Sequence, residues 1–460
     1  MADQATAQEF DILVLGGGSG GYATALRAVQ LGLTVGLVEK AKLGGTCLHN
    51  GCIPTKALLH SAEVADHARD GAKYGVNVEF QSIDMTAVNA YKDGIVAGKF
   101  KGLQGLIKGK GITVIEGEGK LTAPDTITVN GTAYKGKNIV LATGSYSRSL
   151  PGLEIGGRVI TSDEALKMDY VPKSVIVLGG GVIGVEFASV WKSFGVDVTI
   201  VEGLPSLVPN EDASIIKVLE RSFKKRGIKF NTGTFFQGVE QDNDGVKVTL
   251  VDGKTFEADL LLVAVGRGPS TAGLGFEEAG VTVDRGFVIT NERLHTGVGN
   301  VYAVGDIVPG VQLAHRGFQQ GIFVAEEIAG LKPVVVDDIN VPKVTYCDPE
   351  IASVGYSEKA AKEKFGDDRV ESTEYNLAGN GKSAILGTGG IIKFVREKDG
   401  PVVGVHMIGT RVGEQIGEAQ LIVNWEAYPE DVAGLIHAHP TQNEALGEAA
   451  MALAGRPLHG

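Results

Sequence analysis

Two stretches of the chain share one pattern of apolar, glycine-rich and helical positions. Residues 11–39 and 174–202 each contain a short apolar run, a glycine-rich turn, a helical pattern and a second apolar run that ends in glutamate. A short apolar run that ends at such a turn predicts a buried strand, and the periodic segment after the turn predicts a helix. Each stretch therefore predicts a βαβ unit, and the repetition predicts an α/β protein with two such domains.

The glycines of both stretches have a spacing that suits a bound dinucleotide. Each stretch carries three glycines and a terminal acid: Gly16, Gly18, Gly21 and Glu39 in the first, and Gly179, Gly181, Gly184 and Glu202 in the second. Such glycines allow a tight turn, the approach of a pyrophosphate and close packing of helix on strand, while the acid suits a ribose 2′-hydroxyl. Either copy alone could be a glycine-rich turn without a ligand. Two complete copies predict two adenine dinucleotides.

The remaining segments predict further domains. Residues 112–140 alternate apolar and polar positions, which predicts antiparallel strands inserted into the first domain. From residue 341 onward, strands are followed by helical segments at 411–426, 429–436 and 441–454, which predict an α+β domain. We expect four segments in chain order, with limits 1–150, 151–272, 273–340 and 341–460.

Charge and composition narrow the possible partners. The chain has 43 Lys+Arg against 55 Asp+Glu, a formal net charge of −12, and no basic run, so neither nucleic acid nor an anionic membrane is expected as a partner. It has no apolar run of about 18 residues and no basic segment at its start, so we expect no membrane span and no secretory signal. Three cysteines suit a reducing compartment, and we expect a cytoplasmic protein.

Two of the cysteines, Cys47 and Cys52, lie close together in the segment GGTCLHNGCIPTK. In an ideal helix their Cα atoms would be about 8.6 Å apart, whereas a disulfide needs less than about 7 Å. A bridge therefore requires an interrupted helix. Pro54 removes the donor for the carbonyl of Asn50, and Gly51 adds backbone freedom. A loop this short gains little stability from a bridge, so a redox-active disulfide is favoured. A pair of buried thiols and a metal site are alternatives, although no second cysteine pair supports zinc, and we expect no metal.

These motifs together resemble those of the flavoprotein pyridine nucleotide–disulfide oxidoreductases. The resemblance covers nearly the whole chain and rests on GGTCLHNGCIPTK, ATGS (142–145), GGGVIGVE (179–186), VGR (265–267), NVYAVGDI (300–307), LAH (313–315), DPEIASVG (348–355) and HAHPTQNE (437–444). It implies two Rossmann-like domains, one for FAD (1–150 and 273–340) and one for NAD (151–272), and a C-terminal α+β dimerisation domain (341–460). It also implies a homodimer with one non-covalent FAD per subunit.

The family's pattern assigns the catalytic roles. It implies that Cys47 exchanges with the substrate, that Cys52 faces the flavin, and that His439 is the general base, oriented by Glu444 and supplied by the partner subunit. The chemistry of these side chains agrees, because a dithiol is oxidised only after losing a proton, and an imidazole can accept that proton near neutral pH. We interpret the neighbouring His437 as a structural residue.

The family's pattern also assigns cofactor contacts. It implies that Lys56 lies near the flavin and pairs with Glu186. The residues implied for FAD are Gly16, Gly18, Gly21, Glu39, Lys56, Gly119, Thr143, Gly144, Ser145, Asp306 and Ala314. The residues implied for NAD are Gly179, Gly181, Gly184, Glu186, Glu202, Val239 and Gly266.

The sequence departs from the family's pattern at three places. His49 follows Leu48 where asparagine is common, and we interpret it as a solvent-facing spacer, with an electrostatic influence on the thiols as the alternative. Cys347 stands where threonine is usual, and we interpret it as a small buried residue and not as a third redox thiol. Residues 316–320 contain glycine, phenylalanine and glutamines where small and acidic residues are usual.

The segment after Glu202 indicates which nicotinamide nucleotide the protein uses. Residues 203–216 contain no Lys or Arg, whereas the 2′-phosphate of NADP requires cations, so NAD is favoured. The resemblance then implies the branch that oxidises protein-bound dihydrolipoyl groups with NAD⁺. Its partners would be the lipoyl domains and acyltransferase core of 2-oxoacid dehydrogenase complexes, or a glycine cleavage complex. The alternatives are an NAD(P)H-dependent reductase of another small disulfide, and a flavin-binding subunit whose main role is assembly.

Overall fold

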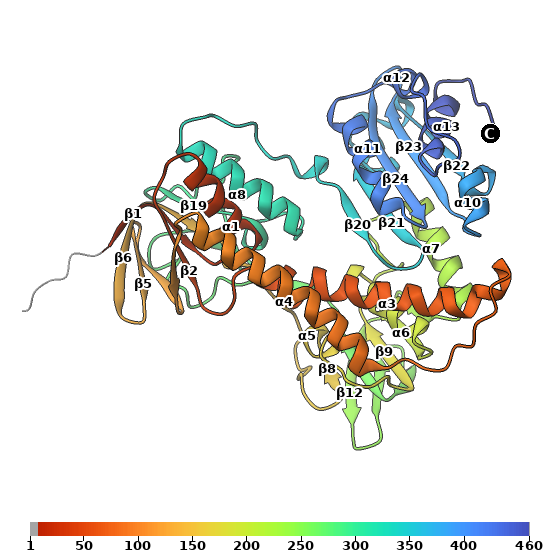
Figure 1. Ribbon diagram of the computed structural model, residues 1–460, viewed down its shortest axis with the longest axis horizontal. Coiled ribbons are helices and arrows are strands. Elements are labelled where there is room, and N and C mark those ends of the chain that lie inside the picture. Colours follow the sequence, from red (N-terminus) through yellow and green to blue (C-terminus); the bar gives the residue numbers. More distant parts are fainter. Residues whose placement is uncertain (1–7, 460) are drawn as a thin grey trace, which may run out of the picture. The chain divides into compact units, whose positions relative to one another are not determined.

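The computed structural model describes residues 8–459, and Figure 1 shows its ribbon. The chain forms two compact units. The first contains the described residues of Met1–Ala57, Thr86–Arg148 and Arg267–Asp338, and the second contains Leu58–Met85, Ser149–Gly266 and the described residues of Ile339–Gly460. The predicted domain limits stay a prediction, because compact units need not coincide with ligand-binding domains.

A seven-stranded sheet forms the centre of the first unit. Its strands are β1 (Glu9–Leu15), β2 (Val35–Glu39), β3 (Thr113–Glu116), β4 (Gly119–Ala123), β5 (Thr126–Val129), β6 (Thr132–Leu141) and β19 (Val301–Ala303). They follow the order β3-β2-β1-β6-β5-β4, and β19 also pairs with β6. The pairs among β1, β2, β3, β6 and β19 are parallel, and their apolar runs are typical of strands buried on both faces. The predicted antiparallel strands are confirmed for β4, β5 and the start of β6, whereas β3 runs parallel to β2.

The first unit also contains helices. They are α1 (Ser19–Gln30), α2 (Gly45–His49), α4 (Met85–Gly109), α8 (Ala314–Ile328) and the first residues of α3 (Cys52–Asp70). α1 packs directly against α8 (Figure 1). Gly321 makes this close packing possible, because a Cβ there would lie 2.3 Å from the carbonyl oxygen of Gly20. The short strands of the unit form two pairs: β7 (Ser145–Ser147) with β16 (Arg267–Pro269), and β17 (Val283–Asp284) with β18 (Phe287–Val288).

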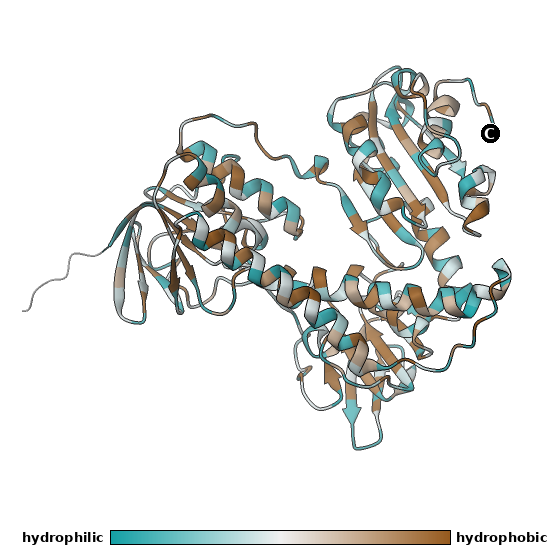
Figure 2. Cartoon of the chain, in the orientation of Figure 1, coloured by the Kyte–Doolittle hydropathy of each residue, from teal (hydrophilic) through white to brown (hydrophobic). Residues whose placement is uncertain are grey.

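The second unit contains a parallel sheet with a similar strand order. Its strands are β8 (Val159–Ile160), β9 (Ser174–Leu178), β10 (Asp197–Glu202), β11 (Lys229–Thr232) and β15 (Leu260–Val263), in the order β11-β10-β9-β15-β8. A separate antiparallel sheet is formed by β12 (Phe236–Gln241), β13 (Val246–Leu250) and β14 (Thr255–Ala258). The helices of this part are α5 (Ser162–Ala165), α6 (Val182–Ser193) and α7 (Ala213–Arg226). Figure 2 shows hydrophobic residues along β9, as expected for a central strand of a buried sheet.

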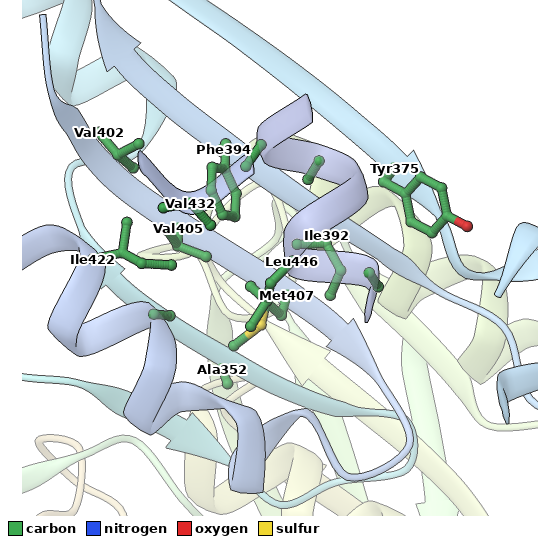
Figure 3. Close-up of a cluster of buried hydrophobic side chains, with 14 of the residues drawn as sticks. Ala352, Tyr375, Ile392, Phe394, Val402, Val405, Met407, Ile422, Val432 and Leu446 are labelled. Carbon is green, nitrogen blue, oxygen red and sulfur yellow. The ribbon is translucent and has the colours of Figure 1, made fainter. Parts of the chain in front are cut away.

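The C-terminal part of the second unit is an antiparallel sheet covered by helices. Its strands are β20 (Lys343–Thr345), β21 (Glu350–Gly355), β22 (Val370–Asn376), β23 (Ile391–Glu397) and β24 (Val402–Gly409), in the order β20-β21-β24-β23-β22. Its helices are α9 (Glu358–Phe365), α10 (Gly381–Ile385), α11 (Val412–Asn424), α12 (Pro429–Ala433) and α13 (Glu444–Leu453). Residues such as Phe394, Met407 and Leu446 form the core between sheet and helices (Figure 3).

The predicted helices after residue 410 are confirmed, but two of their limits were wrong. α12 ends at Ala433, and α13 begins at Glu444 and not at 441. The Glu444 side chain accepts a hydrogen bond from the backbone N–H of Thr441 at 2.8 Å. This bond satisfies a donor outside the helix, so the segment before Glu444 is stabilised as an irregular turn.

Candidate active site

The first glycine-rich turn joins β1 to α1. Gly16 has a φ of +107°, and a Cβ there would lie 2.3 Å from the carbonyl oxygen of Ala142, so only glycine fits. A Cβ at Gly21 would lie 1.8 Å from the carbonyl oxygen of Gly16. Gly18 precedes α1 and makes no side-chain cap, which leaves the first N–H groups of the helix available to an anion. The turn therefore fits a pyrophosphate.

Glu39 ends β2 beside this turn. Its Oε2 accepts a hydrogen bond from the N–H of Gly17 at 2.7 Å, and its Oε1 accepts one from the N–H of Ala41 at 2.8 Å. A cavity beside the carboxylate is lined by residues from several separate segments, among them Gly16, Glu39, Gly119 and Thr143. The structure thus brings together four of the residues predicted for FAD, and this cavity fits the adenosine side of that cofactor.

Asp306 lies in a 3₁₀ turn (Gly305–Ile307) that several side chains hold. Ser145 Oγ donates to Asp306 Oδ2 at 2.5 Å, and Arg267 Nε donates to Ser145 Oγ at 2.8 Å. The N–H of Gly305 donates to Oε1 of the buried Gln320 at 2.8 Å. Arg267 and Gln320 were missed as site residues, because only the folded chain brings them to Asp306.

The other residues predicted for this side of FAD lie in the same unit. Thr143 Oγ1 donates to the carbonyl of Ser270 at 2.5 Å. Gly144 has a φ of +73°, and Ala314 is the first residue of α8. These residues all lie in strand ends, turns or a helix start, where backbone groups can face a ligand.

The unusual residues at 316–320 have physical roles in this unit. Arg316 is buried, and its guanidinium donates to Asp338 Oδ1 and to the carbonyl of Pro309, both at 2.5 Å. Gly317 packs against Gly20 of α1, and Phe318 packs against Tyr22 with ring centroids 5.4 Å apart. This segment therefore joins α8 to α1 and to the turn after Asp306.

The cysteine pair lies at an interrupted helix, as predicted. α2 ends at His49 and α3 begins at Cys52. Both cysteines are thiols in the structure, and a hydrogen bond between the side chains of Cys47 and Cys52 raises the pKa of Cys47, with burial adding to the effect and the charge of Lys56 opposing it. Burial, followed by the nearby Cys47, also raises the pKa of Tyr22 to about 12. The protonated form of Cys47 is therefore favoured in this dithiol state.

The interpretation of His49 as a solvent-facing spacer was wrong. Its side chain is half-buried, and Nε2 hydrogen-bonds to the carbonyl of Leu43 at 2.9 Å. Its ring also meets that of Phe100 edge to face, with centroids 5.0 Å apart. The contact with Phe100 joins residues more than fifty positions apart, so the local sequence could not indicate it.

The second glycine-rich turn, between β9 and α6, repeats the geometry of the first. Gly179 has a φ of +111°, and a Cβ at Gly184 would lie 1.9 Å from the carbonyl oxygen of Gly179. Glu202 accepts hydrogen bonds from the N–H groups of Gly180 at 2.6 Å and Leu204 at 2.7 Å. Gly181 precedes α6 without a side-chain cap. Two further residues are predicted for NAD. Gly266, with a φ of +103°, lies between β15 and β16, and Val239 lies in β12. The turn fits a second dinucleotide.

The loop after Glu202 borders an open cavity that the sequence did not indicate. Pro205 and Ser206 line one side of it, and Lys217, Arg221 and Lys224 of α7 contribute cations. The absence of Lys and Arg at 203–216 therefore does not leave this surface without positive charge.

Glu186 and Cys347 lie near each other in the second unit. Glu186 is buried in α6, and its Oε1 accepts a hydrogen bond from the N–H of Tyr346 at 2.9 Å. Cys347 is buried as predicted, and burial, followed by the charge of Glu186, raises its pKa. Lys56 belongs to the first unit, and its pairing with Glu186 remains a prediction.

The predicted base and its partner are in contact. His439 Nδ1 and Glu444 Oε1 are 2.8 Å apart, and the His439 side chain is 78% exposed. Although burial would raise the pKa of Glu444, the hydrogen bonds from the N–H of Thr441 and from His439 lower it. His437 instead lies half-buried, with Nε2 at 2.7 Å from Glu418 Oε1. Glu444 is thus ionised near neutral pH and orients His439, while His437 is anchored to α11.

Residues 8–459 were searched for a metal-binding group and for a membrane-spanning helix. No group of three or more His, Cys, Asp or Glu side chains in this range has a metal-binding arrangement. No helix in the described part of the chain is long and apolar enough to cross a membrane.

Comparisons with known proteins show the family of the chain. Residues 10–321 match the family described as pyridine nucleotide-disulphide oxidoreductase, and residues 341–450 match the dimerisation domain of that family. The mitochondrial dihydrolipoyl dehydrogenase of Pisum sativum is 41% identical over 98% of this chain and 93% of its own length. A dihydrolipoyl dehydrogenase of Bacillus subtilis is 41% identical over 98% of this chain and 100% of its own. The crystal structure of LpdA from Mycobacterium tuberculosis covers 97% of this chain and 100% of its own, at 26% identity and a TM-score of 0.89.

Proposed function

Because the chain belongs to the pyridine nucleotide-disulphide oxidoreductase family, we propose that it oxidises protein-bound dihydrolipoyl groups to lipoyl groups with NAD⁺, as a dihydrolipoyl dehydrogenase. One observation carries this proposal: the cysteine pair lies beside the first dinucleotide turn. The N–H of Gly44, three residues before Cys47, donates to the carbonyl of Gly17 at 2.8 Å. A redox-active pair next to a flavin site is the arrangement this reaction needs.

The cofactors are FAD and NAD, as in this family and its dihydrolipoyl dehydrogenases. FAD would lie along the turn after β1, with Glu39 at its adenosine ribose and Asp306 at its ribitol. NAD would lie along the turn after β9, with Glu202 at its adenosine ribose. When bound, FAD supplies a two-electron acceptor that is reduced by the cysteine pair and reoxidised by NAD⁺.

In the first half of the reaction, Cys47 and Cys52 start as a disulfide. A substrate thiol gives its proton to His439 and attacks Sγ of Cys47. The disulfide breaks, and Cys52 leaves with the electron pair as a thiolate. Glu444 holds the Nδ1–H side of His439, so Nε2 is the atom that accepts the proton.

In the second half, the other substrate thiol attacks the substrate sulfur of the mixed disulfide, and its proton passes to Sγ of Cys47. Cys47 leaves with the electron pair, and the product is a lipoyl disulfide. The substrate has lost two electrons and two protons, and the cysteine pair has gained the two electrons.

The dimerisation domain at residues 341–450 supports a homodimer. We propose that His439 serves the cysteine pair of the partner subunit, since it is exposed and belongs to this domain. We also propose that the lipoyl domains and acyltransferase core of 2-oxoacid dehydrogenase complexes are the partners, and that the protein is cytoplasmic.

The direct test is the formation of NADH from NAD⁺ and dihydrolipoamide by the purified protein, after its FAD content has been measured. We expect one FAD per chain and rapid turnover with dihydrolipoamide. Oxidised glutathione with NADH or NADPH serves as the comparison substrate. Faster turnover of glutathione than of the lipoamide couple would contradict the proposal and favour a reductase of another small disulfide.

A further inference from the structure

His49 lies between the two cysteines and contacts two other segments of the first unit. Its Nε2 is 2.9 Å from the carbonyl oxygen of Leu43. A carbonyl can only accept, so Nε2 carries the hydrogen and donates it. The ring packs edge to face on Phe100 of α4 at 5.0 Å, with an interplanar angle of 79°. His49 therefore joins the end of α2 both to the loop after β2 and to α4.

The loop that His49 holds is itself attached to the first glycine-rich turn. Leu43 is buried, and the next residue, Gly44, donates its N–H to the carbonyl of Gly17 at 2.8 Å. The backbone at Gly45 is so close that a Cβ there would lie 2.8 Å from Cα of Gly18. Through the carbonyl of Leu43, His49 thus connects the helical turn of Cys47 to the dinucleotide turn.

α2 depends on contacts of this kind. The helix has only five residues, and helices this short are not stable alone in water. Its last backbone hydrogen bond runs from the N–H of Asn50 to the carbonyl of Thr46, and the helix is then interrupted until α3 begins at Cys52. The position of Cys47 relative to Cys52 is therefore set by the contacts that hold the two ends of α2.

The two contacts of the His49 ring favour a role through position. Its hydrogen bond is to the neutral carbonyl of Leu43, and its packing contact is with Phe100. Leu43 and Phe100, which the ring contacts, both lie outside the cysteine pair.

We propose that His49 is a positioning residue for the cysteine pair: its hydrogen bond to Leu43 and its packing on Phe100 hold α2 so that Cys47 stays within reach of Cys52. The proposal rests on the proposed function, in which these two cysteines form a disulfide. Without the contact, the dithiol gains conformational freedom, and closing the disulfide becomes less favourable.

The test measures the cysteine equilibrium in glutathione buffers, without any assay of turnover. Cys47 and Cys52 are oxidised by one oxidised glutathione, which accepts two electrons and two protons and becomes two reduced glutathiones. Alkylation followed by mass spectrometry gives the fraction in each form. In His49→Phe, which keeps a ring and loses the donor, we expect the equilibrium constant for disulfide formation to fall about fivefold, the effect of one hydrogen bond. This corresponds to a midpoint potential higher by about 20 mV.

His49→Gln is the matched control, because its amide can donate to Leu43 but never carries a charge. We expect its equilibrium constant to lie within about twofold of the parent's, as a bond restored by another donor would give. Phe100→Leu keeps the hydrogen bond and loses the ring contact, and we expect a smaller decrease in the same direction. If His49→Phe equals the parent protein, or if His49→Gln falls as far as His49→Phe, the proposal is overturned.

This experiment also separates the two proposals. If the parent protein forms no Cys47–Cys52 disulfide in any glutathione buffer, the proposed function fails, whatever the variants do. If the parent forms it and the variants match the parent, only the role of His49 fails. A charge effect of His49 would give equal losses in His49→Phe and His49→Gln, and would contradict the positioning role.

Discussion

The two glycine-rich units are alike in backbone and differ in the segments that come after them. A Cβ at Gly16 or at Gly179 would lie 2.3 Å from a carbonyl oxygen of the neighbouring strand segment. After each terminal acid the chain returns to the residue that follows the first glycine of the turn. The N–H of Gly44 donates to the carbonyl of Gly17, and the N–H of Val208 donates to the carbonyl of Gly180, both at 2.8 Å.

The two returning loops then lead to different chemistry. The first reaches its contact with a glycine of positive φ and continues into α2 and the cysteine pair, whereas the second uses Val208, with a φ of +39°, and continues into α7. The comparison teaches that the glycines and the acid determine where a dinucleotide can bind, while the segment that follows the acid determines what that site does.

The largest expected effect is on lipoamide turnover, and it distinguishes the two cysteines of the first unit from the cysteine of the second. Cys47→Ser and Cys52→Ser should each lower lipoamide turnover at least a thousandfold, because neither variant can form the disulfide, and both should keep FAD. Cys347→Ala in the second unit is the matched control and should keep at least half of the turnover, since Cys347 is buried and bonds only to the carbonyl of Pro349 in the described contacts. Steady-state NADH formation measures the turnover, and flavin absorbance measures the FAD content. Substantial turnover in either serine variant would disprove the electron path.

The third glycines test which unit holds which cofactor. A Cβ at Gly21 or at Gly184 would lie within 1.9 Å of a carbonyl oxygen, so alanine must displace the turn in either case. We expect Gly21→Ala to lose FAD, and Gly184→Ala to keep FAD but bind NAD⁺ at least tenfold more weakly. Flavin content and NAD⁺ titration distinguish the two. If Gly184→Ala lost FAD and Gly21→Ala kept it, the assignment of FAD to the first unit and NAD to the second would be reversed.

The terminal acids test the choice of nucleotide. We expect the parent protein to prefer NAD⁺ over NADP⁺, because the carboxylate of Glu202 repels a 2′-phosphate. Glu202→Gln should reduce the ratio of kcat/KM values about tenfold, the effect of about 1.4 kcal/mol. The cations Lys217 and Arg221 beside the loop would then favour NADP⁺ further. Glu39→Gln is the control and should leave the ratio unchanged, and an unchanged ratio in Glu202→Gln would place this residue outside the pocket.

A smaller effect is expected from mixing two inactive variants. Cys47→Ser and His439→Gln should regain activity after dissociation and reassociation, because each mixed dimer then has one site with an intact cysteine pair and an intact base. Random reassociation makes half of the dimers mixed, so we expect about a quarter of the parent's turnover. Fully mixed dimers without activity would show that the base acts within its own chain or that the two sites are coupled.

The sequence predicted the elements whose cause is local. The strand, turn, helix and strand of each unit, the helix break between His49 and Cys52, and the antiparallel strands β4 and β5 all follow from short patterns of glycine, proline and apolar residues. The pairing of His439 with Glu444 was implied by the resemblance of the segment HAHPTQNE to the family's pattern, and the two side chains are in contact.

The sequence did not predict features that depend on distant segments. His49 was placed in solvent because nothing near it indicates Phe100, and Arg267 was missed because its partner, Ser145, is 122 residues away. The start of α13 was misplaced because the bond from Thr441 to Glu444 competes with another helical turn. In each case a long-range contact or a side-chain cap decided the outcome.

The most direct test of the account is the anaerobic titration of the FAD-loaded protein with dihydrolipoamide in the absence of NAD⁺. We predict that one equivalent per subunit reduces the protein by two electrons, makes Cys47 reactive to iodoacetamide, and is followed by one NADH per subunit when NAD⁺ is added. If NADH forms while both cysteines stay unreactive at every stage, electrons bypass the pair and the central claim is contradicted.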